Sequence, residues 1–208
     1  MSRLSDALAA YLGPVALARI RTARVGIAGA GGLGSNCAQH LVRSGFRHLR
    51  LVDFDVVEPA NLNRQFYFAA QVGTKKVAAL RENLLAIEPD LPIEAVAGRI
   101  TAENVRDLFA DRDVVVEALD EAGAKVMLVE ALLGRVGCLV AASGIAGWGD
   151  ADAVTVRRIR DDFYLVGDLV AAVGPGRPPL APRVNLAAAK QADVVLDWVL
   201  KNVKEEYD

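Results

Sequence analysis

Residues 29–34, Gly-Ala-Gly-Gly-Leu-Gly, have a pattern that could hold a phosphate. They satisfy G-x-G-x-x-G directly after a short apolar segment and directly before a segment with helical spacing. Glycine is required because backbone amides must approach a phosphate closely and a side chain would block them. Gly29, Gly31, Gly32 and Gly34 are therefore candidate nucleotide-binding residues. The alternative is a tight turn that holds no ligand.

Two acidic residues, Asp53 and Asp120, each follow an apolar segment that is expected to form a strand. Asp53 lies at the spacing where a carboxylate accepts hydrogen bonds from a ribose. Because the carboxyl ends of parallel strands converge on one crevice, both residues are expected to face one site. Asp120 could bind Mg²⁺ together with phosphates. It could also cap the helix expected to begin near residue 121, and both roles stay open.

A long connection over residues 55–73 carries amide and cationic side chains, among them Asn61, Arg64 and Gln65, and Lys76 follows it. A connection of this length in a compact domain is usually functional. One helix terminus can hold the pyrophosphate of NAD, whereas a triphosphate with a leaving group needs additional cations. The connection therefore favours ATP, with Arg64 as a planar fork and Lys76 as a point charge. The alternative is a set of solvated loop charges.

The expected elements alternate between strand and helix. Strands are expected over residues 24–29, 48–54, 93–97, 113–119 and 137–142, and helices over 4–21 with a break at Gly13-Pro14, 34–44, 75–87, 101–109 and 122–133. This alternation predicts an α/β fold, a Rossmann-like, doubly wound and mostly parallel sheet.

The carboxyl-terminal part has a different pattern. Residues 154–159 and 163–166 predict an antiparallel pair, and a final amphipathic helix is expected from about residue 184 to 203. We interpret residues 1–208 as a single domain, with a nucleotide-binding core at about 24–145. Residues of about 146–208 are then a cap on the far edge of the sheet.

Composition narrows the class of partner. The chain has a formal net charge of −2 and 53% hydrophobic residues, which indicates a well-filled core and no nucleic-acid or anionic-membrane partner. Its two cysteines, Cys37 and Cys138, cannot form a disulfide framework or paired Cys-x-x-Cys zinc sites. Both are expected to be buried small hydrophobes. No stretch has the length of a signal peptide or membrane span, which predicts a cytoplasmic protein.

In order, these motifs resemble the ThiF/MoeB/HesA family, relatives of the ubiquitin-activating enzymes. The resemblance rests on the glycine turn, Asp53-x-Asp55, Asn61-Leu-Asn-Arg-Gln65, Gly73-x-x-Lys76 and the segment ending at Asp120. It implies an enzyme that binds Mg-ATP and the Gly-Gly tail of a ubiquitin-like carrier. The carrier's terminal carboxylate attacks the α-phosphate, pyrophosphate leaves, and an acyl-adenylate forms.

The resemblance assigns roles by position: nucleotide lining to Gly29, Gly31 and Gly32, ribose binding to Asp53, phosphate neutralisation to Arg64 and Lys76, magnesium binding to Asp120, and shaping of the phosphate pocket to Asn61 and Gln65. It also implies a homodimer in which an amino-terminal arginine reaches the partner's site, for which Arg3 is the candidate. The zinc-binding cysteines of larger members are absent, so no zinc is expected. No cysteine follows Cys138, so the reaction is expected to end at the adenylate.

The carboxyl-terminal segments 141–147 and 181–192 resemble the short, zinc-less ThiF subgroup. This resemblance implies a ThiS-like sulfur carrier of thiamine-thiazole synthesis. A MoeB-like enzyme acting on a molybdopterin-pathway carrier and a NAD-dependent oxidoreductase are the alternatives. Arg183, at the start of the last expected helix, has two interpretations, a functional residue and a surface residue, of which the surface residue is the simpler.

Overall fold

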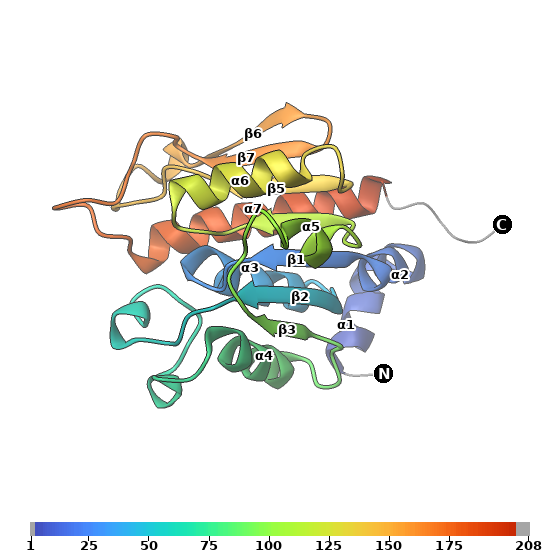
Figure 1. The fold of residues 1–208 in the computed structure, drawn as a ribbon. Helices are drawn as coiled ribbons and strands as arrows, with labels where there is room; N and C mark the ends of the chain where they lie inside the picture. Colours follow the sequence, from blue (N-terminus) through green and yellow to red (C-terminus); the bar gives the residue numbers. More distant parts are fainter. Residues whose placement is uncertain (1–2, 203–208) are drawn as a thin grey trace.

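The computed structural model describes residues 3–202, except for the side chain of Arg3 (Figure 1). A seven-stranded sheet has the order β3-β2-β1-β4-β5-β7-β6. The strands are β1 (Arg24–Ala28), β2 (His48–Asp53), β3 (Glu94–Ala97), β4 (Val114–Glu117), β5 (Cys138–Ala142), β6 (Thr155–Arg160) and β7 (Phe163–Gly167). The α-helices are α1 (Arg3–Leu12), α2 (Pro14–Thr22), α3 (Gly32–Arg43), α4 (Lys76–Ile87), α5 (Val105–Phe109), α6 (Ala122–Leu132) and α7 (Ala181–Asn202). Three short 3₁₀ helices are η1 (Pro59–Asn61), η2 (Ala69–Gln71) and η3 (Ala151–Ala153).

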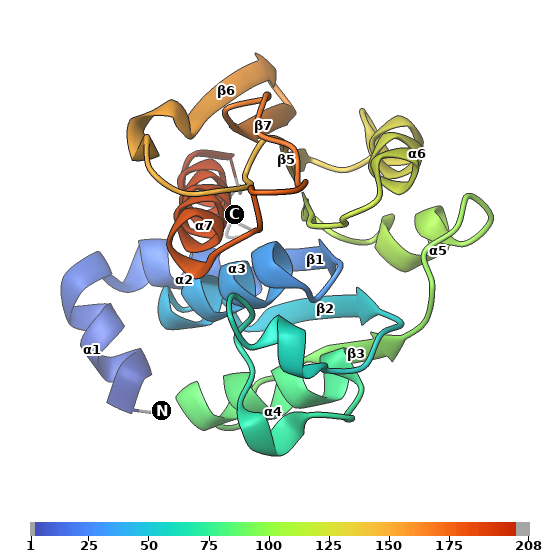
Figure 2. The same cartoon turned by 90° about the vertical axis from the view of Figure 1, so that its left-hand side faces the viewer.

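The first five strands are parallel, which confirms the predicted doubly wound sheet. From β1 the chain proceeds through β2 to β3 at one edge, then crosses back to β4 on the other side of β1. The order of strands therefore reverses between β1 and β4, where ligands of such sheets bind. Figure 2 shows α3 and α7 on one side of the sheet and α5 and α6 on the other. Coverage on both faces explains why every residue of β4 and β5 is buried.

The predicted antiparallel pair is also confirmed. β7 pairs in parallel with β5, and β6 pairs with β7 in antiparallel orientation at the edge of the sheet. Helix α7 packs against α3 and β5. Its buried Gln191 donates from Nε2 to the Glu117 carbonyl at 3.0 Å. Residues 146–202 thus add strands to one edge and a helix to one face, while the assignment of residues 1–208 to one domain stays a prediction.

Several element boundaries differ by one to four residues from those expected. Helix α5 begins only at Val105, because Asn104 Oδ1 accepts a hydrogen bond from the Thr101 amide at 2.8 Å and forms a turn there. Strand β4 ends at Glu117 rather than at residue 119. Helix α7 begins at Ala181, three residues early, because proline is tolerated in a first helical turn that needs no amide hydrogen bond.

The two ends of the sheet differ in what they carry. In Figure 1 the strands β1 to β3 point to the left, where the connection over residues 55–75 and the loop over 168–180 lie. Helices α1 and α2 lie at the opposite end. Among residues 3–202, no helix has both the length and the apolar character needed to cross a membrane.

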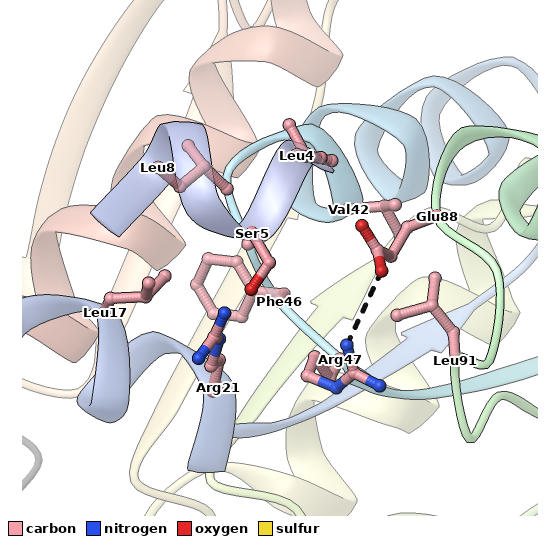
Figure 3. A pocket seen from close by; sticks show the side chains of 11 residues that line it. Leu4, Ser5, Leu8, Leu17, Arg21, Val42, Phe46, Arg47, Glu88 and Leu91 are labelled. Atoms are coloured by element: carbon pink, nitrogen blue, oxygen red, sulfur yellow. Dashed lines mark ion pairs between the residues drawn. The ribbon is translucent and has the colours of Figure 1, made fainter. Parts of the chain in front are cut away.

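A leucine-lined hollow lies at that opposite end, between α1, α2, the end of α3 and the segment before β3 (Figure 3). Its rim carries an ion pair between Arg47 and Glu88, with 3.7 Å between Nη1 and Oε1. Phe46 and Leu91, which line it, lie just before β2 and β3. This hollow is therefore far from the carboxyl ends of the strands, where the glycine turn is located.

Candidate nucleotide site

The glycine turn connects β1 to α3, and two of its glycines are required by packing. Gly29 has φ +97°, and a Cβ there would lie 2.6 Å from the carbonyl oxygen of Ala118. A Cβ on Gly34 would lie 1.8 Å from the carbonyl oxygen of Gly29. Gly34 thus permits close contact between helix and turn, the usual role of the third glycine in this motif. Its contacts give Gly34 a packing role, and its contact with a ligand stays a prediction.

The other two glycines border open space or side chains of the 55–75 connection. A Cβ on Gly31 would meet only the Gln65 Nε2 atom, at 3.9 Å. A Cβ on Gly32 would lie 2.8 Å from Val184 Cγ1 and 3.6 Å from Arg64 Cγ. Within the described chain, no side chain caps the start of α3. The first amides of a helix carry partial positive charge, so this end can bind an anion.

Asp53 is attached to the glycine turn, as the sequence predicted. Its Oδ2 accepts a hydrogen bond from the Ala30 amide at 2.7 Å, and its Oδ1 accepts one from the Asp55 amide at 2.7 Å. Both contacts fix the carboxylate at the end of β2, next to the turn at the end of β1. This position matches the one from which a carboxylate binds ribose.

The first turn of α3 holds the polar 55–75 connection against the glycine turn. Ser35 Oγ accepts a hydrogen bond from the Phe66 amide at 3.0 Å. Asn36 Nδ2 donates to the Arg64 carbonyl at 2.8 Å. These contacts bring residues about thirty positions away to the mouth of the turn. Ser35 and Asn36 were missed by sequence reasoning, although the serine belongs to the motif.

Arg64 and Gln65 both lie beside the turn, but in the described part of the chain only the Arg64 side chain has its hydrogen bonds within the loop. The Arg64 Nη1 atom donates to the Ala60 carbonyl at 3.1 Å and to Asn63 Oδ1 at 2.7 Å, while its aliphatic part packs near Gly32. Gln65 is 8% exposed, and its Oε1 has no hydrogen-bond partner among the described residues. Buried polar atoms are normally satisfied, so an unpaired one next to an open turn is typical of a ligand site.

Asn61 shapes the connection itself. Its side-chain Oδ1 accepts from the Glu58 amide at 3.0 Å, and its carbonyl accepts from the Arg64 and Gln65 amides at 3.2 and 3.0 Å. Asn61 is buried, and in this arrangement it orders the backbone that presents Arg64 and Gln65.

Lys76 is not a solvated loop charge. Its ammonium lies 2.7 Å from Asp55 Oδ2, and its side chain is 9% exposed. Tyr67 links this region to the turn, because its hydroxyl donates to the Ala30 carbonyl at 2.6 Å. Burial, and then the Asp53 and Asp55 carboxylates, raise the pKa of the Tyr67 phenol, so it remains a donor. Sequence reasoning gave no role to Asp55 or Tyr67, although the Asp-x-Asp motif contains the first.

Asp120 lies in the turn between β4 and α6, and its side chain is exposed. The residue that precedes α6 is Glu121, and in the described chain no side chain caps that helix. The interpretation of Asp120 as a helix cap is therefore wrong. Ala118, two residues earlier, packs against Gly29. The turn carrying Asp120 thus lies on one side of the glycine turn, and Asp53 on the other.

Glu117 and Lys125, which sequence reasoning missed, form an ion pair just below this turn, with the carboxylate buried and the lysine half-buried. The Lys125 ammonium is 2.9 Å from Glu117 Oε2, and the Glu117 side chain is 1% exposed. Burial raises the pKa of the Glu117 carboxyl, and the nearby Lys125 opposes that rise. The sequence signal that could have indicated this pair is an acidic residue at the end of a run of valines.

Mg²⁺ fits this site only when nucleotide phosphates supply further ligands. Residues 3–202 contain no group of three or more His, Cys, Asp or Glu side chains that could hold a metal ion. One carboxylate plus nucleotide phosphates is, however, a usual set of Mg²⁺ ligands. The exposed Asp120 carboxylate at the carboxyl end of the sheet is suited to that shared mode.

The two cysteines are free and buried, as expected. Burial raises the pKa of both the Cys37 and the Cys138 thiols to about 12. Because the thiolate is the reactive form, neither is suited to act as a nucleophile.

Arg183 is not on the surface, contrary to expectation. It is 7% exposed, donates from Nη1 to the Gly149 carbonyl at 2.7 Å, and forms an ion pair with Asp168. Asp168 in turn accepts hydrogen bonds from the Val170 and Ala171 amides at 2.7 and 2.8 Å. Arg183 therefore ties together the two loops that follow β5 and β7. The Arg3 side chain lies outside the described residues, and α1 is at the far end of the sheet from the turn.

Fold and site together define a doubly wound α/β protein with a glycine turn where the strand order reverses. A sequence model of the ThiF family matches residues 4–162. The chain belongs to the ThiF family, which confirms the resemblance inferred from the motifs.

Two relatives illustrate the range of the match. The SAMP-activating enzyme E1 of Haloferax volcanii is 37% identical over 118 residues, 56% of this chain and 44% of that protein. The sulfur carrier protein adenylyltransferase of Thermus thermophilus is 35% identical over 127 residues, 60% of this chain and 47% of that protein. The chain therefore spans less than half the length of each.

Solved structures share the fold over nearly the whole chain. The E. coli tRNA N6-threonylcarbamoyladenosine dehydratase TcdA has a TM-score of 0.86 and 22% identity, covering 95% of this chain and 94% of that chain. The same dehydratase in complex with ATP has a TM-score of 0.80 and 23% identity, covering 94% and 91%. At this identity the likeness concerns the fold alone.

Proposed function

We propose that this protein is an ATP-dependent adenylyltransferase. Its substrate is the carboxyl-terminal Gly-Gly carboxylate of a small ubiquitin-like sulfur-carrier protein, and pyrophosphate is released. The observation that carries the proposal is the buried Gln65 amide, whose nitrogen lies near the open face of Gly31 and whose oxygen has no hydrogen-bond partner among the described residues. Membership of the ThiF family and the names of the two relatives give the reaction class.

ATP binds, in this proposal, across the glycine turn. The first amides of α3 and the open face of Gly31 receive phosphate oxygens. Arg64, whose stem already packs near Gly32, exchanges its contacts within the loop for a phosphate. A guanidinium can bind two phosphate oxygens with its planar fork. Asp53, held by the Ala30 amide, accepts hydrogen bonds from the ribose hydroxyls.

Lys76 supplies the second positive charge. Asp55 holds the Lys76 ammonium at 2.7 Å in a position that side-chain entropy would otherwise disfavour. A preorganised cation can stabilise charge that develops on the leaving pyrophosphate without further reorganisation. Asp120 would hold Mg²⁺, which neutralises phosphate oxygens when bound.

The reaction needs no protein nucleophile. A carboxylate oxygen of the carrier forms a bond to the α-phosphorus, and the bond from that phosphorus to the pyrophosphate oxygen breaks. The residues around the turn act by positioning and charge stabilisation. With Cys37 and Cys138 both buried, the reaction ends at the acyl-adenylate.

The carrier body would lie over the loops that follow β5 and β7. Trp148, Val170 and Val173 are 66%, 79% and 66% exposed there. Exposed apolar side chains gathered in one region mark interaction sites. Asn63 Nδ2 donates to the Pro179 carbonyl at 3.2 Å, so this loop adjoins the segment that carries Arg64. A carrier seated on the loops would have its tail near the α-phosphate.

We further propose a ThiS-like carrier of thiamine-thiazole synthesis, a cytoplasmic homodimer, and activity without zinc, nucleic acid or membrane. The short carboxyl-terminal pattern around residues 141–147 and 181–192 supports the ThiS-like carrier over a molybdopterin-pathway one. Sedimentation of the purified protein tests the dimer.

ATP–pyrophosphate exchange tests the proposal directly. Exchange is expected only with Mg²⁺ and a carrier ending in Gly-Gly, and a carrier that lacks its last two residues is the matched control. Mass spectrometry of each candidate carrier should detect the added adenylate. No exchange with any cognate ThiS-like or molybdopterin-pathway carrier would refute the activity, and tight NADH binding without ATP binding would favour an oxidoreductase.

A further inference from the structure

A buried carboxylate interrupts a strand that is otherwise made of valine. Glu117 follows Val114, Val115 and Val116 in β4, and all four are fully or almost fully buried. Burial of a charge is unfavourable unless it is paired, and apolar residues of similar volume often stabilise a fold as well or better. A fourth valine would suit the strand, so stability alone does not explain the carboxylate.

The partner of Glu117 joins three elements at this point. Lys125, in the second turn of α6, donates from Nζ to both Glu117 carboxylate oxygens at 2.9 Å each. The same ammonium donates to the Ala142 carbonyl at the end of β5, at 3.1 Å. The pair therefore fixes the carboxyl ends of β4 and β5 relative to the start of α6.

The turn from residue 118 to 120 is held from two sides. Below it, Glu117 Oε1 accepts a hydrogen bond from the Leu119 amide at 2.7 Å, which bends the chain out of the strand. On the other side, the Ala118 amide donates to the Ala28 carbonyl at 2.9 Å, next to the glycine turn. Asp120 follows these contacts directly, with an exposed side chain.

We propose that Glu117 and Lys125 are positioning residues for Asp120. They hold the turn in the conformation that directs the Asp120 carboxylate toward the metal and phosphates beside the glycine turn. This inference rests on the proposed function, because it requires Mg-ATP in that crevice. Replacing a residue that orients a metal ligand commonly lowers the affinity for the metal tenfold or more.

The experiment compares Lys125→Met with the parent in the full chain. Calorimetric titration with a non-hydrolysable ATP analogue is repeated over a series of Mg²⁺ concentrations and in EDTA. Lys125→Met is expected to raise the Mg²⁺ concentration for half-maximal binding about tenfold, with metal-free affinity within about twofold of the parent. Lys125→Arg should restore most of the Mg²⁺ response, since it keeps a charged donor.

Two further variants separate positioning from stability. Arg112→Met removes a different cation, which is buried and pairs with Glu94 at the opposite end of the sheet. It should lower the unfolding temperature and leave the Mg²⁺ requirement at the parent value. In an Asp120→Asn background, Lys125→Met should cause no further loss, because the residue that it positions has already been removed.

The outcomes distinguish this inference from the proposed function. A parent protein without Mg²⁺-dependent nucleotide binding would refute both. A responsive parent with an unchanged Lys125→Met protein, or effects of Lys125→Met and Asp120→Asn that simply add, would overturn the positioning role alone. If Lys125→Met does not fold, Glu117→Gln takes its place with the same expectation, since a neutral amide no longer forms the ion pair with the Lys125 ammonium.

Discussion

Substitution of glycine by alanine is expected to lower stability at Gly34 and ATP affinity at Gly31, two positions three residues apart. At Gly34 the new methyl group would lie 1.8 Å from the Gly29 carbonyl oxygen. At Gly31 it would meet only Gln65 Nε2, at 3.9 Å, which is ordinary contact. The first substitution therefore challenges packing, and the second only fills space in front of the turn.

The magnitudes follow from these distances. Relief of the Gly34 contact requires helix and turn to separate by more than 1 Å, and overpacking of this kind costs about 3 kcal/mol. That is a large share of the roughly 5–15 kcal/mol that stabilises a typical domain. Gly31 has φ −79°, which alanine adopts. Gly31→Ala should therefore change stability by about 1 kcal/mol or less. It should weaken ATP binding at least tenfold, or about 1.4 kcal/mol.

Chemical denaturation and calorimetric titration with ATP measure the two quantities separately. Gly34→Ala should lose about 3 kcal/mol of the unfolding free energy, whereas Gly31→Ala should keep it and lose affinity. A Gly31→Ala protein with the parent's ATP affinity would refute the location of the phosphates. A Gly34→Ala protein with parental stability would refute the packing role of that glycine.

Three further predictions concern other parts of the molecule. Arg64→Ala should lower carrier-dependent ATP–pyrophosphate exchange about a hundredfold or more, as for other lost transition-state donors, and full activity would remove it from the mechanism. Cys37 and Cys138, whose thiol pKa values are raised to about 12, should resist iodoacetamide at pH 8 until the protein is unfolded; labelling of the native protein, measured by mass spectrometry, would contradict their burial. Arg183→Met should cost about 2 kcal/mol in denaturation, since the contacts of Arg183 with the Gly149 carbonyl and the Asp168 carboxylate are lost, while ATP affinity is kept; a loss of affinity with no loss of stability would give Arg183 a direct role in binding.

Local patterns in the chain predicted much of this architecture. The alternation of strand and helix, the glycine turn after β1 and the acidic residue after β2 each depend on residues close together in sequence. The parallel core and the antiparallel β6–β7 pair are accordingly confirmed. Asp53 was expected beside the turn and is hydrogen-bonded to it.

Other features could not be predicted from local patterns, because they depend on contacts with residues of other elements. Lys76 looks like a loop cation in sequence, yet its side chain is buried and pairs with Asp55. Arg183 looks like a surface residue at a helix start, yet the loop after β7 surrounds it. Each is decided by a contact that exists only after the chain has folded.

The sequence by itself therefore determined the family, the alternation of strands and helices, and the set of polar residues near the carboxyl ends of the strands. It could do so because glycine conformation, strand periodicity and charge act over a few residues. Only the tertiary structure separated Gly31, open to a ligand, from Gly34, closed by Gly29, and revealed Glu117 with Lys125 below Asp120. Steric exclusion and desolvation depend on neighbours in space, and the folded chain supplies those neighbours.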